Sequence, residues 1–102
     1  MSEFVQKQQT ILRRLGRGLK QLRLERNDSQ AVFAERLGVS RLTCIKMEQG
    51  HPAVAIKHWI NASILLGQEQ AWESLFHKET SLFEQFDQLQ TPVRQRTRSR
   101  RK

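Results

Sequence analysis

The sequence predicts an all-α protein of five helices, followed by an extra amphipathic helix and a basic tail. Apolar residues recur every three or four positions along most of the chain, which is the spacing of one face of a helix. No stretch alternates apolar and polar residues as a half-buried strand does. Tyrosine is absent, and glycine and proline are few, so little in the composition favours sheets or long loops.

The first helix is expected over residues 8–26. Its apolar stripe consists of Ile11, Leu12, Leu15, Leu19 and Leu22. Gly16 and Gly18 lie inside this helix, and each costs roughly 1 kcal/mol relative to alanine. Packing against the rest of the protein must therefore hold the helix together. The run Asn27-Asp28-Ser29 then breaks the pattern.

Two short helices are expected next. Ser29 is a good N-cap for the second, because its hydroxyl can accept a hydrogen bond from an orphan backbone N–H. The apolar face of the second helix consists of Val32, Phe33, Ala34 and Leu37. Gly38 suits the left-handed position that ends a helix, and Ser40 caps the third helix, which runs to about Gln49. Cys44, Met47 and Ile45 are its inward candidates.

The sequence Gly50-His51-Pro52 ends the third helix, because proline cannot continue it. A fourth helix is expected over about 55–66, stopped by Gly67. Its apolar residues are Ile56, Trp59, Ile60, Ile64 and Leu65. Residues 69–90 form one or two amphipathic segments, with one stripe of Trp72, Leu75 and Phe76 and another of Leu82, Phe83, Phe86 and Leu89. Ser81 and Glu84 form a possible capping box between them.

Length and composition restrict the class of protein. A chain of 102 residues holds one small domain and a tail. A single cysteine excludes an intrachain disulfide framework, no apolar run approaches the ~18 residues that span a bilayer, and no secretory signal begins the chain. We expect a cytoplasmic protein, bacterial and nucleoid-associated, with no membrane contact. The net charge of +8 predicts a polyanionic partner.

The charge is distributed unevenly. Residues 1–58 carry +6, residues 59–91 carry −4 and residues 92–102 carry +6. This pattern divides the chain into a domain at 8–67, C-terminal helices at 68–91 that make dimer or partner contacts, and a tail at 92–102 that is expected to be disordered when free.

The most informative stretch, residues 29–50, reads SQAVFAERLGVSRLTCIKMEQG. Two short helices separated by a tight turn are typical of a helix-turn-helix, whose second helix enters the major groove of DNA. The pattern SQ…FAE…LGVSR…T…KME…G resembles the lambda-repressor-like family, also called the Cro/C1 or XRE type, over about residues 11–66. The resemblance implies a sequence-specific transcriptional repressor that binds double-stranded DNA at a palindromic operator.

A narrower resemblance concerns residues 37–67, which are similar to HipB-type antitoxins. Such proteins are small repressors encoded beside HipA-type kinase toxins, and they carry a turn like Gly-Asp-Pro where this chain has Gly50-His51-Pro52. The resemblance therefore implies an autoregulating component of a toxin–antitoxin operon, with a HipA-like kinase as its partner. A stand-alone phage or mobile-element repressor shares much of the pattern and remains an alternative.

The family match and the chemistry of the side chains together suggest a set of DNA-binding residues: Gln30, Ser40, Arg41, Leu42, Thr43 and Lys46. Arg41 is the best candidate to read a base, because its planar fork fits guanine O6 and N7. Leu42 offers an apolar contact to a thymine methyl group, and Gln30 either donates to a phosphate or joins the contacts of the third helix. The alternative for each residue is a plain solvated surface.

A second set has weaker phosphate-binding character: Ser29, His51, Lys57, Arg94, Arg96 and Arg98. The arginines of the tail can bind phosphates without a fold, or simply keep the chain soluble. Arg23 and Glu48 resemble a structural pair with which the family ties the first helix to the end of the third.

No catalytic or metal-binding pattern accompanies these motifs. The three histidines and Cys44 lack metal-ligand spacing, and neither a phosphate-binding glycine loop nor a nucleophile elbow occurs, so we expect no enzyme activity, metal or cofactor. Cys44 is read as a small core hydrophobe, with a redox sensor as the alternative. One recognition helix per chain predicts a homodimer, since two-fold repressors place these helices about 34 Å apart. A helical protein-interaction module without DNA binding and a non-specific DNA coater remain rival interpretations.

Overall fold

The structure, a computed structural model, describes residues 2–78 and contains five helices and no strand within them. The helices are α1 (Glu3–Glu25), α2 (Gln30–Leu37), α3 (Arg41–Glu48), α4 (Ile56–Leu65) and α5 (Gln70–Glu73). The all-α prediction is confirmed. The expected amphipathic stripe at 82–89, the capping box at Ser81 and Glu84, and the basic tail lie outside the described residues.

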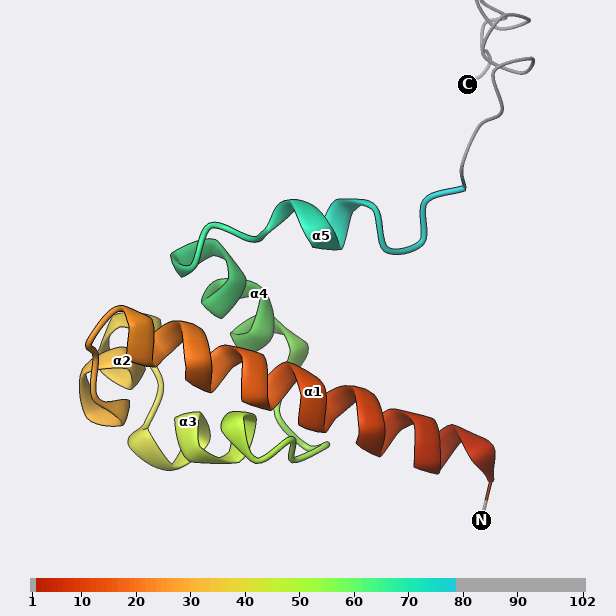
Figure 1. The fold of residues 1–102 in the computed structure, drawn as a ribbon, viewed down its shortest axis with the longest axis horizontal. Helices are drawn as coiled ribbons and strands as arrows, with labels where there is room; N and C mark the ends of the chain where they lie inside the picture. The colour runs from red at the N-terminus through yellow and green to blue at the C-terminus, as the bar shows by residue number, and fades with distance from the viewer. Residues whose placement is uncertain (1, 79–102) are drawn as a thin grey trace, which may run out of the picture.

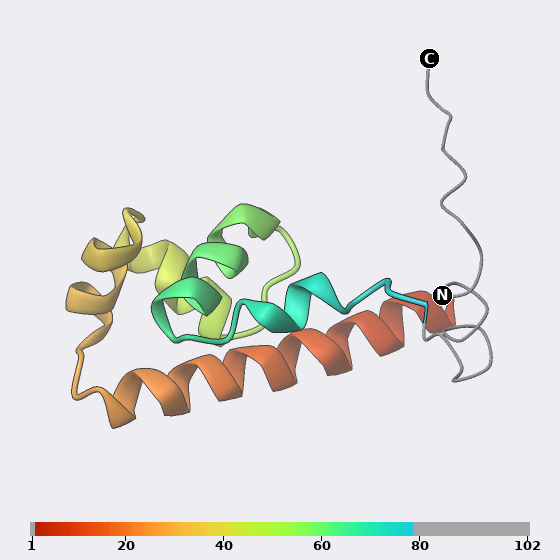
Figure 2. The same cartoon turned by 90° about the horizontal axis from the view of Figure 1, so that it is seen from above.

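Helix α1 is the long axis of the molecule, and the shorter helices gather along it (Figure 1). Helix α3 packs against both α1 and α2, and α2 also contacts α4. Figure 2 shows α2 at one end of α1 and the N-terminus at the other. The C-terminal half of α1 therefore belongs to the packed domain, whereas its N-terminal half projects beyond it.

The prediction that α1 begins at residue 8 is wrong, because the helix begins at Glu3. Residues 3–7 are exposed apart from Val5, so they carry no apolar stripe that would reveal a helix. Interactions between nearby charges favour the helix over these residues instead. Glu3 complements the positive N-terminal end of the helix dipole, and it pairs with Lys7 one turn later at 3.5 Å.

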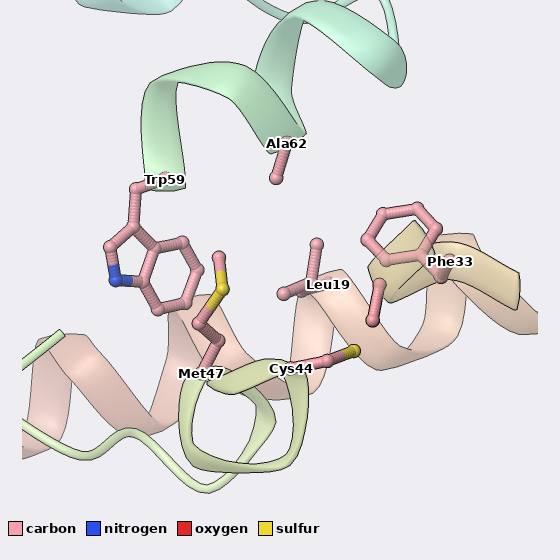
Figure 3. Packing of buried hydrophobic residues seen from close by; sticks show 7 residues of the cluster. Leu19, Phe33, Cys44, Met47, Trp59 and Ala62 are labelled. Carbon is pink, nitrogen blue, oxygen red and sulfur yellow. The ribbon is translucent and has the colours of Figure 1, made fainter. Parts of the chain in front are cut away.

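The core is small and draws on four helices. Figure 3 shows it: Leu19 from α1, Phe33 and Ala34 from α2, Cys44 and Met47 from α3, and Trp59 and Ala62 from α4. Phe33, Cys44 and Met47 are fully buried. The inward positions predicted for the second and third helices are thus confirmed for Phe33, Ala34, Cys44 and Met47.

Several predicted core residues are instead exposed, which corrects the sequence interpretation. They are Ile11, Leu15, Val32, Ile56 and Ile64. In α2 the cause is geometric, because Val32 precedes Phe33 by one residue and so points about 100° away from it. Ile56 is the first residue of α4. Leu75 and Phe76, which the sequence left open between the core and a dimer or partner contact, follow α5 and are exposed. Trp72, unlike Leu75 and Phe76, is tied to α4, because its indole Nε1 donates a hydrogen bond to Ser63 Oγ at 2.8 Å.

Two glycines allow the backbones of α1 and α3 to approach each other. A Cβ atom on Gly16 would lie 2.7 Å from the carbonyl oxygen of Met47, and closer still to that of Glu48. Gly50 follows α3 with a φ of 77°, and a Cβ there would lie 2.9 Å from the backbone nitrogen of Arg13. This crossing sets the position of α3 relative to α1.

The two glycines inside α1 are expected to respond to alanine in opposite directions. Gly16→Ala must push backbone against backbone and should destabilise the protein by about 2–3 kcal/mol. Gly18 has no atom within 4 Å of its ideal Cβ position, so Gly18→Ala should gain up to about 1 kcal/mol from helix propensity. Chemical denaturation of both variants measures these changes; equal effects at the two sites would contradict the close crossing.

Candidate nucleic-acid interface

The two short helices α2 and α3, with the turn between them, are delimited by three residues that act locally. Ser29 Oγ accepts from the backbone N–H of Val32 at 3.1 Å, and Ser40 Oγ accepts from that of Thr43 at the same distance. Gly38 ends α2 in the left-handed conformation with a φ of 75°. These caps and the glycine fix where each helix begins and ends, and so set the short connection between them.

The outward face of α3 carries side chains that suit DNA. Arg41 and Leu42 are exposed at its first turn, while Thr43 and Lys46 are half-buried beside them. Cys44 and Met47 on the opposite face anchor the helix in the core. The Ser40 and Thr43 hydroxyl oxygens lie 3.1 Å apart, so Ser40 both caps α3 and orients Thr43. Arg41, Leu42, Thr43 and Lys46 thus lie outside the core along α3.

A buried ion pair joins α1 to the end of α3. Arg23 Nε donates to Glu48 Oε2 at 2.6 Å, and Arg23 Nη2 donates to Glu48 Oε1 at 3.2 Å. The two side chains are only 6% and 5% exposed. The bond to Glu48 raises the pKa of Arg23 above its ordinary value, and Arg23 Nη1 also donates to the carbonyl oxygen of Asp28 at 2.8 Å. The Arg23 guanidinium thus joins α1 to the end of α3 and to Asp28 in the loop before α2.

Gln30 extends this pair toward the recognition helix. Its amide nitrogen donates to Glu48 Oε1 at 3.1 Å, and its amide oxygen accepts from Arg41 Nη2 at 3.4 Å. The Gln30 side chain thus contacts two residues of α3, and its role toward DNA stays a prediction. A chain of contacts runs from Arg23 through Glu48 and Gln30 to Arg41, and it supports the exposed guanidinium from the protein interior.

A cleft at the base of α3 was not predicted from the sequence. It has a volume of about 280 Å³ and is lined by Thr43, Lys46, Ala53, Val54, Ala55 and His58. Ala55 occupies the N-cap of α4 without a side-chain hydrogen bond, and His58 Nδ1 is buried with no hydrogen-bond partner among the described residues. The one local signal was an alanine where Ser, Thr, Asp or Asn usually caps a helix.

The second set of predicted phosphate contacts is scattered. Lys57 is exposed in the first turn of α4, close in sequence to the cleft. His51 is also exposed, but its Nδ1 accepts from the backbone N–H of Ala53 at 3.1 Å and so shapes the loop after α3. Ser29 already uses its hydroxyl as the cap of α2. Arg94, Arg96 and Arg98 lie outside the described residues.

Cys44 lies in an environment that disfavours its thiolate. Burial, together with the neighbouring carboxylate of Glu48, raises the pKa of the Cys44 thiol to about 11. At neutral pH the thiol is therefore protonated, which fits the core reading and not a reactive redox sensor. Within residues 2–78, no group of three His, Cys, Asp or Glu side chains is arranged to hold a metal ion. In the same part of the chain, no helix has the length and apolar character needed to cross a membrane.

Comparison with known proteins adds one positive finding. Residues 19–68 match the family model described as Helix-turn-helix, the Cro/C1 or XRE type. A search of curated proteins and a search of solved structures each gave no match. The matched region contains α2, α3, α4 and the Arg23–Glu48 pair, but it leaves out the N-terminal half of α1. Residues 19–68 are therefore similar to helix-turn-helix domains, which are DNA-binding domains of transcriptional regulators.

Proposed function

We propose that this protein is a sequence-specific repressor that binds a palindromic operator as a homodimer and blocks RNA polymerase there. The supporting observation is the chain of contacts from Arg23 to Arg41, which presents an arginine fork at the exposed first turn of α3. Arg41 reads a guanine, Leu42 and Thr43 contact neighbouring bases or phosphates, and Lys46 reaches the backbone from the edge of the cleft.

The phosphate contacts follow from the same placement. The first-turn N–H groups of α2 and α4 carry partial positive charge, and Lys57 adds a full charge at the start of α4. The basic residues Arg94, Arg96 and Arg98 add salt-dependent affinity, with a slope of about 0.9 per phosphate neutralised. These groups strengthen binding, whereas the side chains of α3 select the sequence.

We further propose that the repressor is the HipB-like component of a toxin–antitoxin operon, which it regulates itself, and that a HipA-like kinase is its protein partner. The similarity of residues 37–67 to HipB-type antitoxins supports this assignment, and the departure at Gly50-His51-Pro52 weakens it. A HipA-like kinase gene beside this gene is the expected arrangement. Integrase or phage genes in that position would instead favour a stand-alone repressor. Either role places the protein on the nucleoid of a bacterial cell.

Selection of binding sites from random DNA, followed by footprinting, tests the proposed function. We expect enrichment of a palindrome whose half-sites lie about 10–10.5 base pairs apart, because each half-site receives one α3 helix. The footprint should cover both half-sites at physiological salt. A footprint without a preferred site would favour a non-specific DNA coater, and no enrichment at all would favour a protein-interaction module.

A further inference from the structure

Three cations in the middle of α1 form a basic face beside the recognition helix. Arg13, Arg17 and Lys20 are exposed, and none of them makes an ion pair in the described part of the chain. The acidic residues of this helix, Glu3 and Glu25, lie at its two ends. Three positive charges within eight residues of α1 thus lack a described counter-charge. We call Arg13, Arg17 and Lys20 the basic face.

The close crossing of α1 and α3 fixes the direction in which the basic face points. Gly16 packs against the last carbonyl groups of α3, so a Cβ atom at position 16 would point toward α3. Successive residues of a helix are turned by about 100°. Lys20 and Arg13 therefore project about 40° and 60° away from the direction of Gly16, and Arg17 projects about 100° away. All three lie on the same flank of the contact with α3.

The neighbouring side of α3 belongs to the predicted recognition surface. Glu48 is bonded to Arg23 of α1, so it marks the side of α3 that faces α1. Arg41 lies seven residues before Glu48, which places both residues on one side of the helix, two turns apart. Figure 1 shows α3 below α1, with α4 and α5 above, so the open face of α3 is turned away from those two helices. A DNA strand bordering that face on the α1 side would pass beside the basic face.

We propose that the basic face of α1 binds DNA phosphates next to the half-site that α3 reads. Guanidinium and ammonium groups are the protein cations that pair with phosphate oxygens, and such contacts position a protein on DNA without reading its sequence. Arg13 and Arg17 precede residue 19, where the family match begins, so most of this site lies outside the matched region. The proposal rests on the operator binding of the proposed function and adds a phosphate site to it.

The salt dependence of operator binding by the full chain tests this site. Arg13→Gln/Lys20→Gln should make the slope of log K against log salt shallower by about 1.8, because two phosphates lose their cations at about 0.9 each. The matched control is Lys7→Gln/Arg14→Gln, which removes one lysine and one arginine that are also exposed on α1. These two side chains project about 160–180° from the direction of Gly16, away from α3. The control should change the slope by less than about 0.5, because distant exposed charges are screened.

Specificity and stability separate this site from base reading and from a folding defect. In Arg13→Gln/Lys20→Gln, the ratio of affinities for the palindrome and its single-base variants should stay that of the wild type, whereas Arg41→Ala should change it. The unfolding transition should not shift, because both replaced side chains are exposed. An altered ratio would mean that the basic face reads bases, which would contradict the proposed phosphate site.

The outcomes for this site and for the proposed function are distinguishable. If the wild type selects a palindrome and Arg13→Gln/Lys20→Gln leaves the slope unchanged, the phosphate site alone is overturned. An equal change of slope in the control pair would overturn it too, because the charges would then act without regard to their position. A slope change confined to Arg13→Gln/Lys20→Gln on DNA without a preferred site would support the phosphate site and remove the sequence-specific repressor. A wild type that binds no DNA removes both.

Discussion

Replacing Glu48 by alanine is expected to destabilise the protein by about 3–5 kcal/mol, which is a large part of the stability of a small domain. The substitution leaves the Arg23 guanidinium, whose side chain is only 6% exposed, with the carbonyl oxygen of Asp28 as its remaining hydrogen-bond partner among the described residues. It also removes the acceptor of the Gln30 amide nitrogen. Denaturant unfolding followed by circular dichroism measures the loss.

A double-mutant cycle separates the energy of the Arg23–Glu48 interaction from the separate effects of the two side chains. Arg23→Met and Glu48→Met should each be strongly destabilising, because each leaves one charge buried alone. The double variant Arg23→Met/Glu48→Met should be less destabilised than either single variant, since it removes both charges and keeps the volume. The control is Glu3→Ala, which breaks the exposed pair with Lys7 and should have no measurable effect. A small effect of Glu48→Ala would show that the pair is hydrated in solution.

Local signals predicted α2 and α3 well, because the determinants of these helices lie within a few residues. Ser29 and Ser40 each cap an N–H three residues later, and Gly38 ends α2 through its own backbone conformation. The start of α1 could not be found in this way. Helix propensity and one ion pair stabilise residues 3–7, and neither produces an apolar period that a reader of the sequence can detect.

The candidate site was only partly visible in the sequence, because tertiary contacts define it. Arg23 and Glu48 are 25 positions apart, and their pairing was suggested by family resemblance and not by spacing. The contact of Gln30 with Arg41 depends on how α2 and α3 cross. The cleft with His58 depends on the path of the loop before α4. The residue types on the third helix indicated contact with DNA. The hydrogen bond that supports Arg41 could be seen only once the fold was known.

Replacing Arg41 by alanine is expected to weaken operator binding by about 5- to 150-fold, because a bidentate arginine–guanine contact is worth about 1–3 kcal/mol of discrimination. The loss should be greatest for the guanine that Arg41 reads and smaller at other positions. Arg41 is exposed, and within the described residues its side chain makes one hydrogen bond, the 3.4 Å contact with Gln30, so the unfolding transition should not shift. Gel-shift titration against the selected palindrome and its single-base variants measures both quantities.

The matched control is Arg36→Ala, which removes the same charge from an exposed side chain whose partner, Asp28, is mostly buried. It should change affinity far less than Arg41→Ala. The rival functions give different results. A protein-interaction module predicts that Arg41→Ala leaves function intact, and a non-specific DNA coater predicts that it matters no more than deletion of residues 93–102. Gln30→Ala provides an independent check, because it keeps the Arg41 guanidinium but removes its support. An affinity between those of the wild type and Arg41→Ala would show that Gln30 positions the reader.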